Sequence, residues 1–336
     1  MNGNKVFIIA EAGVNHNGNF KMAKKMIHVA KSCGADAIKF QIYTAEDVVS
    51  SEAEMAPYQK KNVKKRITQL ELLKQYELTS TQWQNLKKEC DRIHIEFMAT
   101  AHCESAIPLV TELVKRHKIA SGDITNFNLI NRLAKQGKQI ILSTGMSTFD
   151  EVKNAVSWIR VQNNDNIVVM QCTSVYPCPP DQANLKVISK LKDYLQLPVG
   201  FSDHTRSLIA PSVAVALGAT YIEKHFTLSR SLSGPDHLAS LNPPELKSMI
   251  NNIRATERLL GNYEKEPTYA ELAIKKNVRK SIFAKENIKI GDKITSAKLE
   301  FKRPGTGIGA EEINMIEGSI AKRNINKGLM LSRGDL

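Results

Sequence analysis

The sequence predicts a (β/α)8 barrel followed by a small β-rich domain. Three observations lead to this prediction: short β-branched runs alternate with amphipathic helical runs over about 260 residues, polar side chains stand at the ends of several strands, and an internal repeat follows a polar segment. The alternative is an open doubly wound sheet. Such a sheet usually carries a GxGxxG loop after its first strand, and residues 11–18, EAGVNHNG, do not match that pattern.

Eight strands, each followed by a helix, are expected in the first part of the chain. The expected strands are Val6–Ala12, Ala37–Tyr43, Ile95–Ala101, His117–Ser121, Gln139–Thr144, Ile167–Thr173, Val199–His204 and Tyr221–Thr227. The expected helices are Phe20–Cys33, Ser80–Ile93, Glu104–Val114, Asn128–Lys135, Thr148–Val161, Leu185–Leu195, Leu208–Leu217 and Pro243–Leu260. Right-handed crossovers would place successive strands side by side and parallel. Residues 44–65 are expected to form a long excursion on the upper face of the barrel.

The composition changes after Gly261, where a polar segment with Pro267 begins. The pattern AKxNIxxG at residues 284–291 recurs at residues 321–328, which indicates a short pseudo-symmetric β-rich module. A module of this size is expected to have little core of its own and to lean on something larger. The predicted organisation is a barrel over residues 1–261, a linker over 262–278 and a small C-terminal domain over 279–336.

The composition is that of an ordinary soluble protein, with 42% hydrophobic and 24% charged residues. No apolar run reaches the roughly 20 residues that cross a bilayer, and the first residues lack a signal-peptide pattern. The five cysteines include no CxxC pair, so we expect free thiols in a reducing compartment and no structural zinc site. A cytoplasmic protein with no membrane partner is therefore expected.

The net charge of +13 raises the question of an anionic partner. The lysines are spread along predicted helix faces, no basic tract is interleaved with aromatic residues, and no nucleic-acid motif is present. We therefore expect no nucleic-acid partner. A positive field that attracts a small anionic substrate fits the same charge.

Several polar residues stand where a barrel strand would point its side chains inward. Side chains alternate faces along a strand, and the outer face must meet the apolar helices. The residues expected to point inward are Lys39, Gln41, Ser202, His204, Glu223 and His225. Burying ionisable groups costs several kcal/mol unless they are paired or coordinated. A stray ion pair between Lys39 and Glu223 would explain one such residue, but the convergence of many predicts a functional site.

The carboxyl ends of the strands carry further polar residues, and active sites of this fold lie at that end. They include Glu11, Lys118, Ser121, Ser143, Thr173, Ser174, Tyr176 and, after the last strand, Asp236. His204 and His225 end adjacent strands and could share a divalent cation such as manganese, iron, cobalt or zinc. Two unrelated histidines at strand ends are the alternative. The lysines and hydroxyls suit a phosphate and a carboxylate, so an anionic substrate and a metal-polarised carbonyl are indicated.

The motifs resemble those of the bacterial sialic acid synthases, the nonulosonate synthases that use phosphoenolpyruvate. The resemblance spans nearly the whole chain in collinear order. It rests on IAEAGVNHNG at residues 9–18, IKFQ at 38–41, KIASGD at 118–123, LSTGM at 142–146, GFSDHT at 200–205, EKHFT at 223–227, GPDH at 234–237 and KRPGTG at 302–307.

The resemblance implies a barrel followed by an antifreeze-like (SAF) domain, in a homodimer whose cap domain is exchanged with the partner. The implied reaction condenses phosphoenolpyruvate with the open-chain form of an N-acetylated amino sugar and releases phosphate by C–O cleavage. N-acetylmannosamine, giving N-acetylneuraminate, is the first expected acceptor. The alternative is a 2,4-diacetamido-2,4,6-trideoxy sugar, giving N,N'-diacetyllegionaminate by the same chemistry.

The resemblance also assigns roles to residues. His204 and His225 would hold Mn2+, with Mg2+ or Co2+ also possible. The implied catalytic residues are Glu11, Lys39, Tyr176 and Asp236, and either Glu11 or Asp236 would activate the attacking water. The implied substrate-binding residues are Gln41, Lys118, Ser121, Ser143, Ser174, Ser202 and Arg303, the last supplied by the partner chain to the N-acetyl group.

Three positions depart from the pattern of the family. His102 stands where relatives often have an aromatic residue, Ser174 where Asn or Thr is common, and Asp123 where Glu is frequent. All three border the sugar side, so they bear on the identity of the sugar more than on the chemistry. His102 is as compatible with a solvent-exposed rim residue as with a substrate contact.

Two other functions are compatible with parts of the sequence. A binding protein could use the terminal repeat to recognise ice or carbohydrate, with the barrel as scaffold, but a scaffold would not need buried charge at Lys39. A metal-dependent aldolase could form a Schiff base through Lys39 or Lys118, and borohydride trapping with pyruvate would reveal it.

Overall fold

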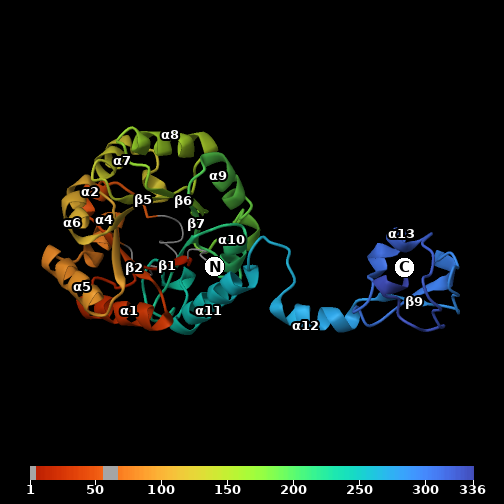
Figure 1. Cartoon of the computed structure of the whole chain (residues 1–336). Helices are drawn as coiled ribbons and strands as arrows, with labels where there is room; N and C mark the ends of the chain where they lie inside the picture. The colour runs from red at the N-terminus through yellow and green to blue at the C-terminus, as the bar shows by residue number, and fades with distance from the viewer. Residues whose placement is uncertain (1–4, 56–66) are drawn as a thin grey trace. The chain divides into compact units, whose positions relative to one another are not determined.

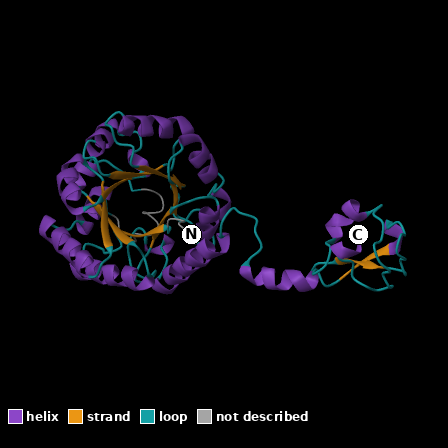
Figure 2. Cartoon of the chain, in the orientation of Figure 1, coloured by secondary structure: helices purple, strands orange, loops and turns teal. Residues whose placement is uncertain are grey.

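Eight parallel strands close into a barrel in chain order, β1 to β8, which confirms the predicted fold class (Figure 1). The computed structural model describes residues 5–55 and 67–336. Helices surround the strands, as the colouring by secondary structure shows (Figure 2). The chain divides into two units, Met1–Gly261 and Asn262–Leu336.

The barrel elements lie close to their predicted positions. The strands are β1 Phe7–Gly13, β2 Ala37–Ile42, β3 Glu96–Ala101, β4 Arg116–Ile119, β5 Gln139–Ser143, β6 Ile167–Cys172, β7 Val199–Asp203 and β8 Tyr221–His225. The helices are α1 Phe20–Cys33, α2 Ala45–Val48, α4 Gln69–Tyr76, α5 Ser80–Arg92, α6 Ile107–Leu113, α7 Phe127–Ala134, α8 Phe149–Arg160, α9 Val187–Leu195, α10 Ala210–Ala216 and α11 Pro243–Leu260.

The differences from prediction are local. Helix α4, which begins at a Thr68–Glu71 capping box, was not predicted. The predicted excursion begins with the short helix α2, and its residues 56–65 lie outside the described part of the chain. β4 ends at Ile119, and residues Ser121–Asp123 form a turn of 3-10 helix instead of continuing the strand.

Side-chain alternation divides the barrel into an apolar outer face and a layered interior. The outer face packs under the helices through large residues such as Phe40, Phe97 and Phe201. Inside, one apolar layer consists of Ile9, Ala37, Met98, Ile141, Val168 and Met170. The next inward positions toward the carboxyl ends of the strands are polar. The apolar layer therefore forms a floor beneath a polar chamber.

A buried ion pair lies on the helix side of β7 and β8. Nζ of Lys224 is 2.6 Å from Oδ2 of Asp203 and also donates to the carbonyl oxygen of Thr205. Lys224 and Asp203 are each at most 1% exposed. The pair links β7 to β8 next to His204, which follows β7, and His225, which ends β8.

Arg116 closes the end of the barrel opposite the polar chamber. Its guanidinium donates to both carboxylate oxygens of Glu96, at 2.7 and 3.0 Å, and to Gln139 and Tyr221 at 2.8 and 3.2 Å. The Cζ atom also lies 4.3 Å from the centroid of the Phe7 ring. Through these contacts the Arg116 side chain of β4 joins β3, β5, β8 and β1.

Replacing Arg116 with methionine should lower the free energy of unfolding of the barrel by about 2 kcal/mol, because charge-assisted hydrogen bonds to partly buried partners are lost. Urea unfolding followed by tryptophan fluorescence measures this, since both tryptophans, Trp83 and Trp158, lie in the first unit. Arg160→Met is the control, because its exposed pair with Asp165 should contribute about 1 kcal/mol or less. Equal effects of the two substitutions would contradict the role assigned to Arg116.

The C-terminal unit has internal two-fold character that follows the sequence repeat. It contains the antiparallel pair β9 Ser281–Ala284 and β10 Leu299–Lys302 and the short helix α13 Ile313–Ile316. Equivalent asparagines act reciprocally: Asn287 accepts from the Lys327 amide and Asn324 from the Ile290 amide. The unit has its own apolar cluster of Ile282, Ala284, Ile288, Ile294, Leu299, Ile308, Ile316, Ala321, Ile325 and Leu331. It is therefore better packed than the sequence suggested.

The segment expected to be a linker contains the helix α12, Tyr269–Val278. The helix begins at a capping box formed by Thr268 and Glu271, as α4 begins at one formed by Thr68 and Glu71. All of its residues are exposed, including Tyr269 and Leu272. Among the helices of the described residues, none is long and apolar enough to span a membrane.

Candidate active site

Two histidines face each other at the carboxyl ends of β7 and β8. The ring centroids of His204 and His225 lie 5.4 Å apart, and both residues are buried. Nδ1 of His204 hydrogen-bonds to the carbonyl oxygen of Thr173 at 2.8 Å, which leaves Nε2 as the nitrogen with a free lone pair. The ring of Tyr176 packs against His204 at 4.1 Å between centroids and meets His225 edge-on at 5.6 Å. These neighbours orient the pair.

The histidine pair has the donor chemistry of a divalent metal site. Nδ1 of His225 is buried and has no hydrogen-bond partner among the described residues, as expected for a nitrogen that serves as a metal ligand. Within residues 5–55 and 67–336, no group of three or more His, Cys, Asp or Glu side chains is arranged to hold a metal. A cation held by the two imidazoles would take its other ligands from water or substrate, which is typical of a catalytic site.

Two lysines and two glutamates form a buried charge network inside the barrel. Nζ of Lys39 lies 3.0 Å from Oε2 of Glu11 and 3.7 Å from Oε2 of Glu223. Nζ of Lys118 lies 3.5 Å from Oε1 of Glu223. All four residues are at most 4% exposed. The Lys39–Glu223 contact is therefore part of a larger network, and so much buried charge points to a functional site rather than to stability.

The pKa values in this network diverge. Burial, which would lower the pKa of Lys39, is outweighed by Glu11 and Glu223, so that pKa is raised. For Lys118, burial dominates and lowers the pKa. Burial raises the pKa of Glu11 above its usual range, whereas Lys118 and Lys39 overcome burial and lower the pKa of Glu223. Glu11 is thus the carboxyl group suited to proton exchange, and Glu223 stays charged.

Hydroxyl groups surround the lysines. Nζ of Lys118 donates to Oγ of Ser143 at 2.7 Å, and Nζ of Lys39 donates to Oγ1 of Thr100 at 3.1 Å. Oγ of Ser202 donates to Oε1 of Glu223 at 2.9 Å. Two ammonium groups among hydroxyls are the donor set that a phosphate or carboxylate requires.

Ser121 and Ser174 meet at Gly145, just after β5. The Gly145 amide donates to Oγ of Ser121 at 3.0 Å. A Cβ at position 145 would lie 2.2 Å from Oγ of Ser174 and 2.8 Å from Oγ of Ser121. The absence of a side chain therefore lets the backbone approach both hydroxyls at the edge of the polar chamber.

A β-bulge positions Glu11 between two other functional side chains. Glu11 is paired in register with Lys39 of β2 and with His225 of β8, and the register with β2 shifts between Glu11 and Gly13. Gly13 has φ of +50°, and a Cβ there would lie 3.3 Å from Glu11 and 3.4 Å from Gln41. Glycine therefore permits the turn that keeps Glu11 inside the barrel.

Asp236 lies in the loop after β8 and is held through its backbone. Its carbonyl oxygen accepts from Oγ of Ser240 at 2.7 Å, and Nδ2 of Asn15 donates to the same Ser240 oxygen at 2.9 Å. Asp236 is buried, and burial raises its pKa to about 6. A second carboxyl group that can exchange protons near neutral pH thus belongs to the site.

A cavity of about 90 Å3 adjoins His225. It is lined by predicted site residues, Gln41, Tyr176, His225 and Asp236, together with Pro235. Val14 and three residues of α4, Leu72, Leu73 and Tyr76, also line it. The lining of the cavity therefore mixes polar and apolar side chains.

The barrel brings together every predicted site residue except Arg303, which lies in the C-terminal unit and donates from Nε to the carbonyl oxygen of Val278 at 3.1 Å. The prediction missed Thr100, although an inward polar residue near the end of β3 could have been recognised from strand alternation. It also missed the contribution of α4, which lines the cavity beside His225.

His102 is only partly exposed. Its Nδ1 lies 3.9 Å from Oδ2 of Asp123. Burial, together with the charges of Lys39 and Lys118, lowers the pKa of His102 to about 3.

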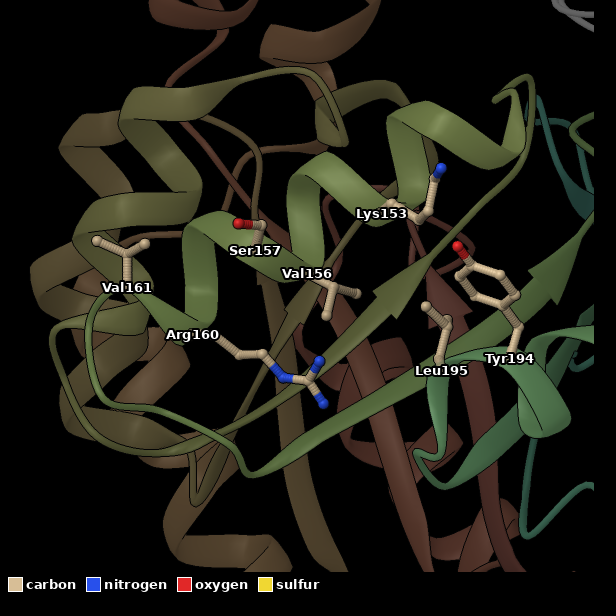
Figure 3. Close-up of a pocket in the computed structure, with 7 residues that line it drawn as sticks. All are labelled: Lys153, Val156, Ser157, Arg160, Val161, Tyr194 and Leu195. Atoms are coloured by element: carbon tan, nitrogen blue, oxygen red, sulfur yellow. The ribbon is translucent and has the colours of Figure 1, made fainter.

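A larger groove of about 460 Å3 lies on the outside of the barrel between α8 and α9. Figure 3 shows Lys153, Val156 and Arg160 of α8 facing Tyr194 and Leu195 of α9. Its two cations are already paired, Lys153 with Asp150 at 2.6 Å and Arg160 with Asp165 at 3.1 Å. The groove shares no residue with the polar chamber, so the chemistry is assigned to the barrel end.

Comparison with known families supports the assignment of the two units. Residues 26–265 match the model of the NeuB family, and residues 279–336 match the model of the SAF domain. The resemblance identified from the motifs is therefore confirmed.

Characterised relatives extend over nearly the whole chain. The chain is 43% identical to an N,N'-diacetyllegionaminic acid synthase of Legionella pneumophila, covering 97% of this chain and 93% of that protein. It is 37% identical to human N-acetylneuraminate-9-phosphate synthase, covering 88% and 82%. A crystal structure of N-acetylneuraminic acid synthetase from Leptospira borgpetersenii in complex with citrate is similar, with 34% identity, a TM-score of 0.73, and coverage of 81% and 90%.

Proposed function

The chain belongs to the NeuB family and is a phosphoenolpyruvate-using nonulosonate synthase, and we propose that it condenses phosphoenolpyruvate with an open-chain 2,4-diacetamido-2,4,6-trideoxy sugar to form N,N'-diacetyllegionaminate. N-acetylmannosamine, giving N-acetylneuraminate, is the second candidate acceptor. The greater identity to the legionaminic acid synthase, 43% against 37%, favours the first. The reaction itself is carried by one observation, the convergence of two lysines and two histidines in one polar chamber.

Phosphoenolpyruvate is assigned to the deeper part of the chamber. Lys39 and Lys118 supply two positive charges, and the hydroxyls of Ser121, Ser143 and Ser202 supply further donors. Thr100, which already accepts from Lys39, joins this set. Binding of the phosphate and carboxylate would replace some of the lysine–glutamate contacts, because the anion competes for the same ammonium groups.

The acceptor sugar is assigned to the rim. Gln41, Ser174, Tyr176 and Asp236 supply its polar contacts, and Arg303 of a second copy of the chain would reach its N-acetyl group in a cap-exchanged homodimer. His204 and His225 would hold the divalent cation that the family generally uses, which we propose to be Mn2+, with Mg2+ or Co2+ as alternatives. When bound there, the cation polarises the aldehyde oxygen as a Lewis acid.

The side chains of the chamber then transfer protons and stabilise the charge of the departing phosphate. C3 of phosphoenolpyruvate attacks the aldehyde carbon, a C–C bond forms, and the aldehyde oxygen takes a proton from the protonated carboxyl group of Glu11 or Asp236, whose pKa values are both raised by burial. Water then adds to the cationic C2 and gives a proton back to the carboxylate that was formed. The resulting hemiketal phosphate loses phosphate by C2–O cleavage, which leaves the 2-keto acid. Lys39 and Lys118 stabilise the departing phosphate.

Incubation of the protein with Mn2+, phosphoenolpyruvate and each candidate sugar tests the proposal by phosphate release. We expect release with the diacetamido sugar at higher kcat/KM than with N-acetylmannosamine. If the bridging oxygen of phosphoenolpyruvate carries 18O, the label should appear in the released phosphate, because the C–O bond breaks. Absence of release with every amino sugar contradicts the synthase assignment. A borohydride-trapped adduct with pyruvate at Lys39 or Lys118 would instead support a Schiff-base aldolase.

A further inference from the structure

Four of the residues that line the cavity beside His225 carry no role in the mechanism above. We call them the α4 wall and define it as Val14, Leu72, Leu73 and Tyr76. They line the same cavity of about 90 Å3 as His225 and Asp236, which are assigned to the metal and the acceptor. An acceptor bound at those two residues therefore has the α4 wall beside it.

The α4 wall is a built surface rather than a loose loop. Leu72 and Tyr76 are spaced to lie on one face of α4, and both are buried together with Val14 in a separate apolar cluster. The hydroxyl of Tyr43 donates to the carbonyl oxygen of Leu73 at 3.4 Å, which ties the helix to the end of β2. Val14, Leu72 and Leu73 therefore present a fixed apolar surface to whatever occupies the cavity.

Such a wall discriminates between methyl and hydroxyl substituents. A hydroxyl placed against leucine side chains loses its hydrogen bonds to water without gaining new ones, whereas a methyl group gains contact. The cavity has room for a small substituent but not for a second ring. The two candidate acceptors differ in this respect: one ends in a methyl group and carries a second acetamido group, and the other ends in a hydroxymethyl group.

We infer that the α4 wall selects the acceptor and favours the 6-deoxy, diacetamido sugar over N-acetylmannosamine. This inference rests on the proposed function and assigns its acceptor preference to particular residues. Leu73 is the residue through which it can be altered, because it is only partly buried and its replacement leaves the packing of Leu72 and Tyr76 in place.

The test measures kcat/KM for both sugars with the full-length protein, Mn2+ and phosphoenolpyruvate. In Leu73→Gln, which replaces the apolar end of the side chain with an amide, the preference for the diacetamido sugar should fall about 10-fold. Leu73→Met, an apolar replacement of similar volume, should retain the wild-type preference. Leu259→Gln, an exposed position on α11, controls for the chemical change alone and should also retain it.

The outcomes separate the two claims. An unchanged preference in a folded, active Leu73→Gln protein overturns the role of the wall and leaves the proposed reaction intact. A wild-type protein that prefers N-acetylmannosamine also overturns it. A wild-type protein that releases phosphate with neither sugar contradicts the proposed function and, with it, this inference. A loss of preference confined to Leu73→Gln, with an unchanged Kd for phosphoenolpyruvate, supports selection at the wall.

Discussion

Replacing His225 with alanine is expected to lower metal-dependent phosphate release about 1000-fold or more while the protein stays folded. The imidazole is one of two nitrogen ligands assigned to the cation, and a Lewis acid that stabilises developing charge contributes several kcal/mol, at about 1.4 kcal/mol per tenfold change in rate. Calorimetric titration with Mn2+ measures binding independently of turnover, and the variant should lose it.

His94→Asn is the matched control for this substitution. His94 is exposed, lies at the start of β3 away from the polar chamber, and has φ of +58°, a conformation that asparagine tolerates. It should bind Mn2+ and turn over as the wild type does. Unchanged Mn2+ binding in His225→Ala would remove that histidine from the metal site.

Replacing Glu11 with glutamine should lower kcat about 100- to 10,000-fold, the range for loss of a general acid or base. The change is isosteric, and it removes one negative charge from a chamber that must accept an anion. The Kd of phosphoenolpyruvate, measured by calorimetry without acceptor, should therefore stay the same or fall. A split between a large loss in kcat and preserved binding would identify Glu11 as a proton-transfer group.

Asp236→Asn provides the comparison, because either carboxyl group could accept the proton of the attacking water. The larger loss of kcat identifies the carboxyl group on which turnover depends more. Full activity of Glu11→Gln would show that its buried carboxyl serves only to pair with Lys39.

The barrel and its polar interior could be predicted because strand alternation is a local property. Once Lys39 and Gln41 share a face opposite Phe40, the requirement that helices cover the apolar face decides which side chains point inward. The same argument places Ser202, Glu223 and His225, and the structure agrees at each position. Their assembly into one network follows from closure of the sheet, which brings the ends of all strands to one mouth.

The features that were missed depend on tertiary contacts. Strand alternation could have marked Thr100 as an inward polar residue, but its contact with Lys39 is seen only in the folded barrel. α4 follows a long connection, and no local pattern shows that Leu72 and Leu73 line the cavity beside His225. The lowered pKa of His102 likewise depends on burial and on the charges of Lys39 and Lys118, which lie on neighbouring strands.

The apolar floor of the barrel has a consequence for the order of events. Ile9, Met98, Ile141 and Met170 fill the cylinder beneath the charge network, and Arg116 closes the far end. Reactants can therefore enter only from the rim. Under the assigned roles, phosphoenolpyruvate occupies the deeper position and the sugar covers it. Binding is thus ordered: phosphoenolpyruvate must bind before the sugar. The phosphate formed beneath the sugar cannot leave until the sugar acid has dissociated.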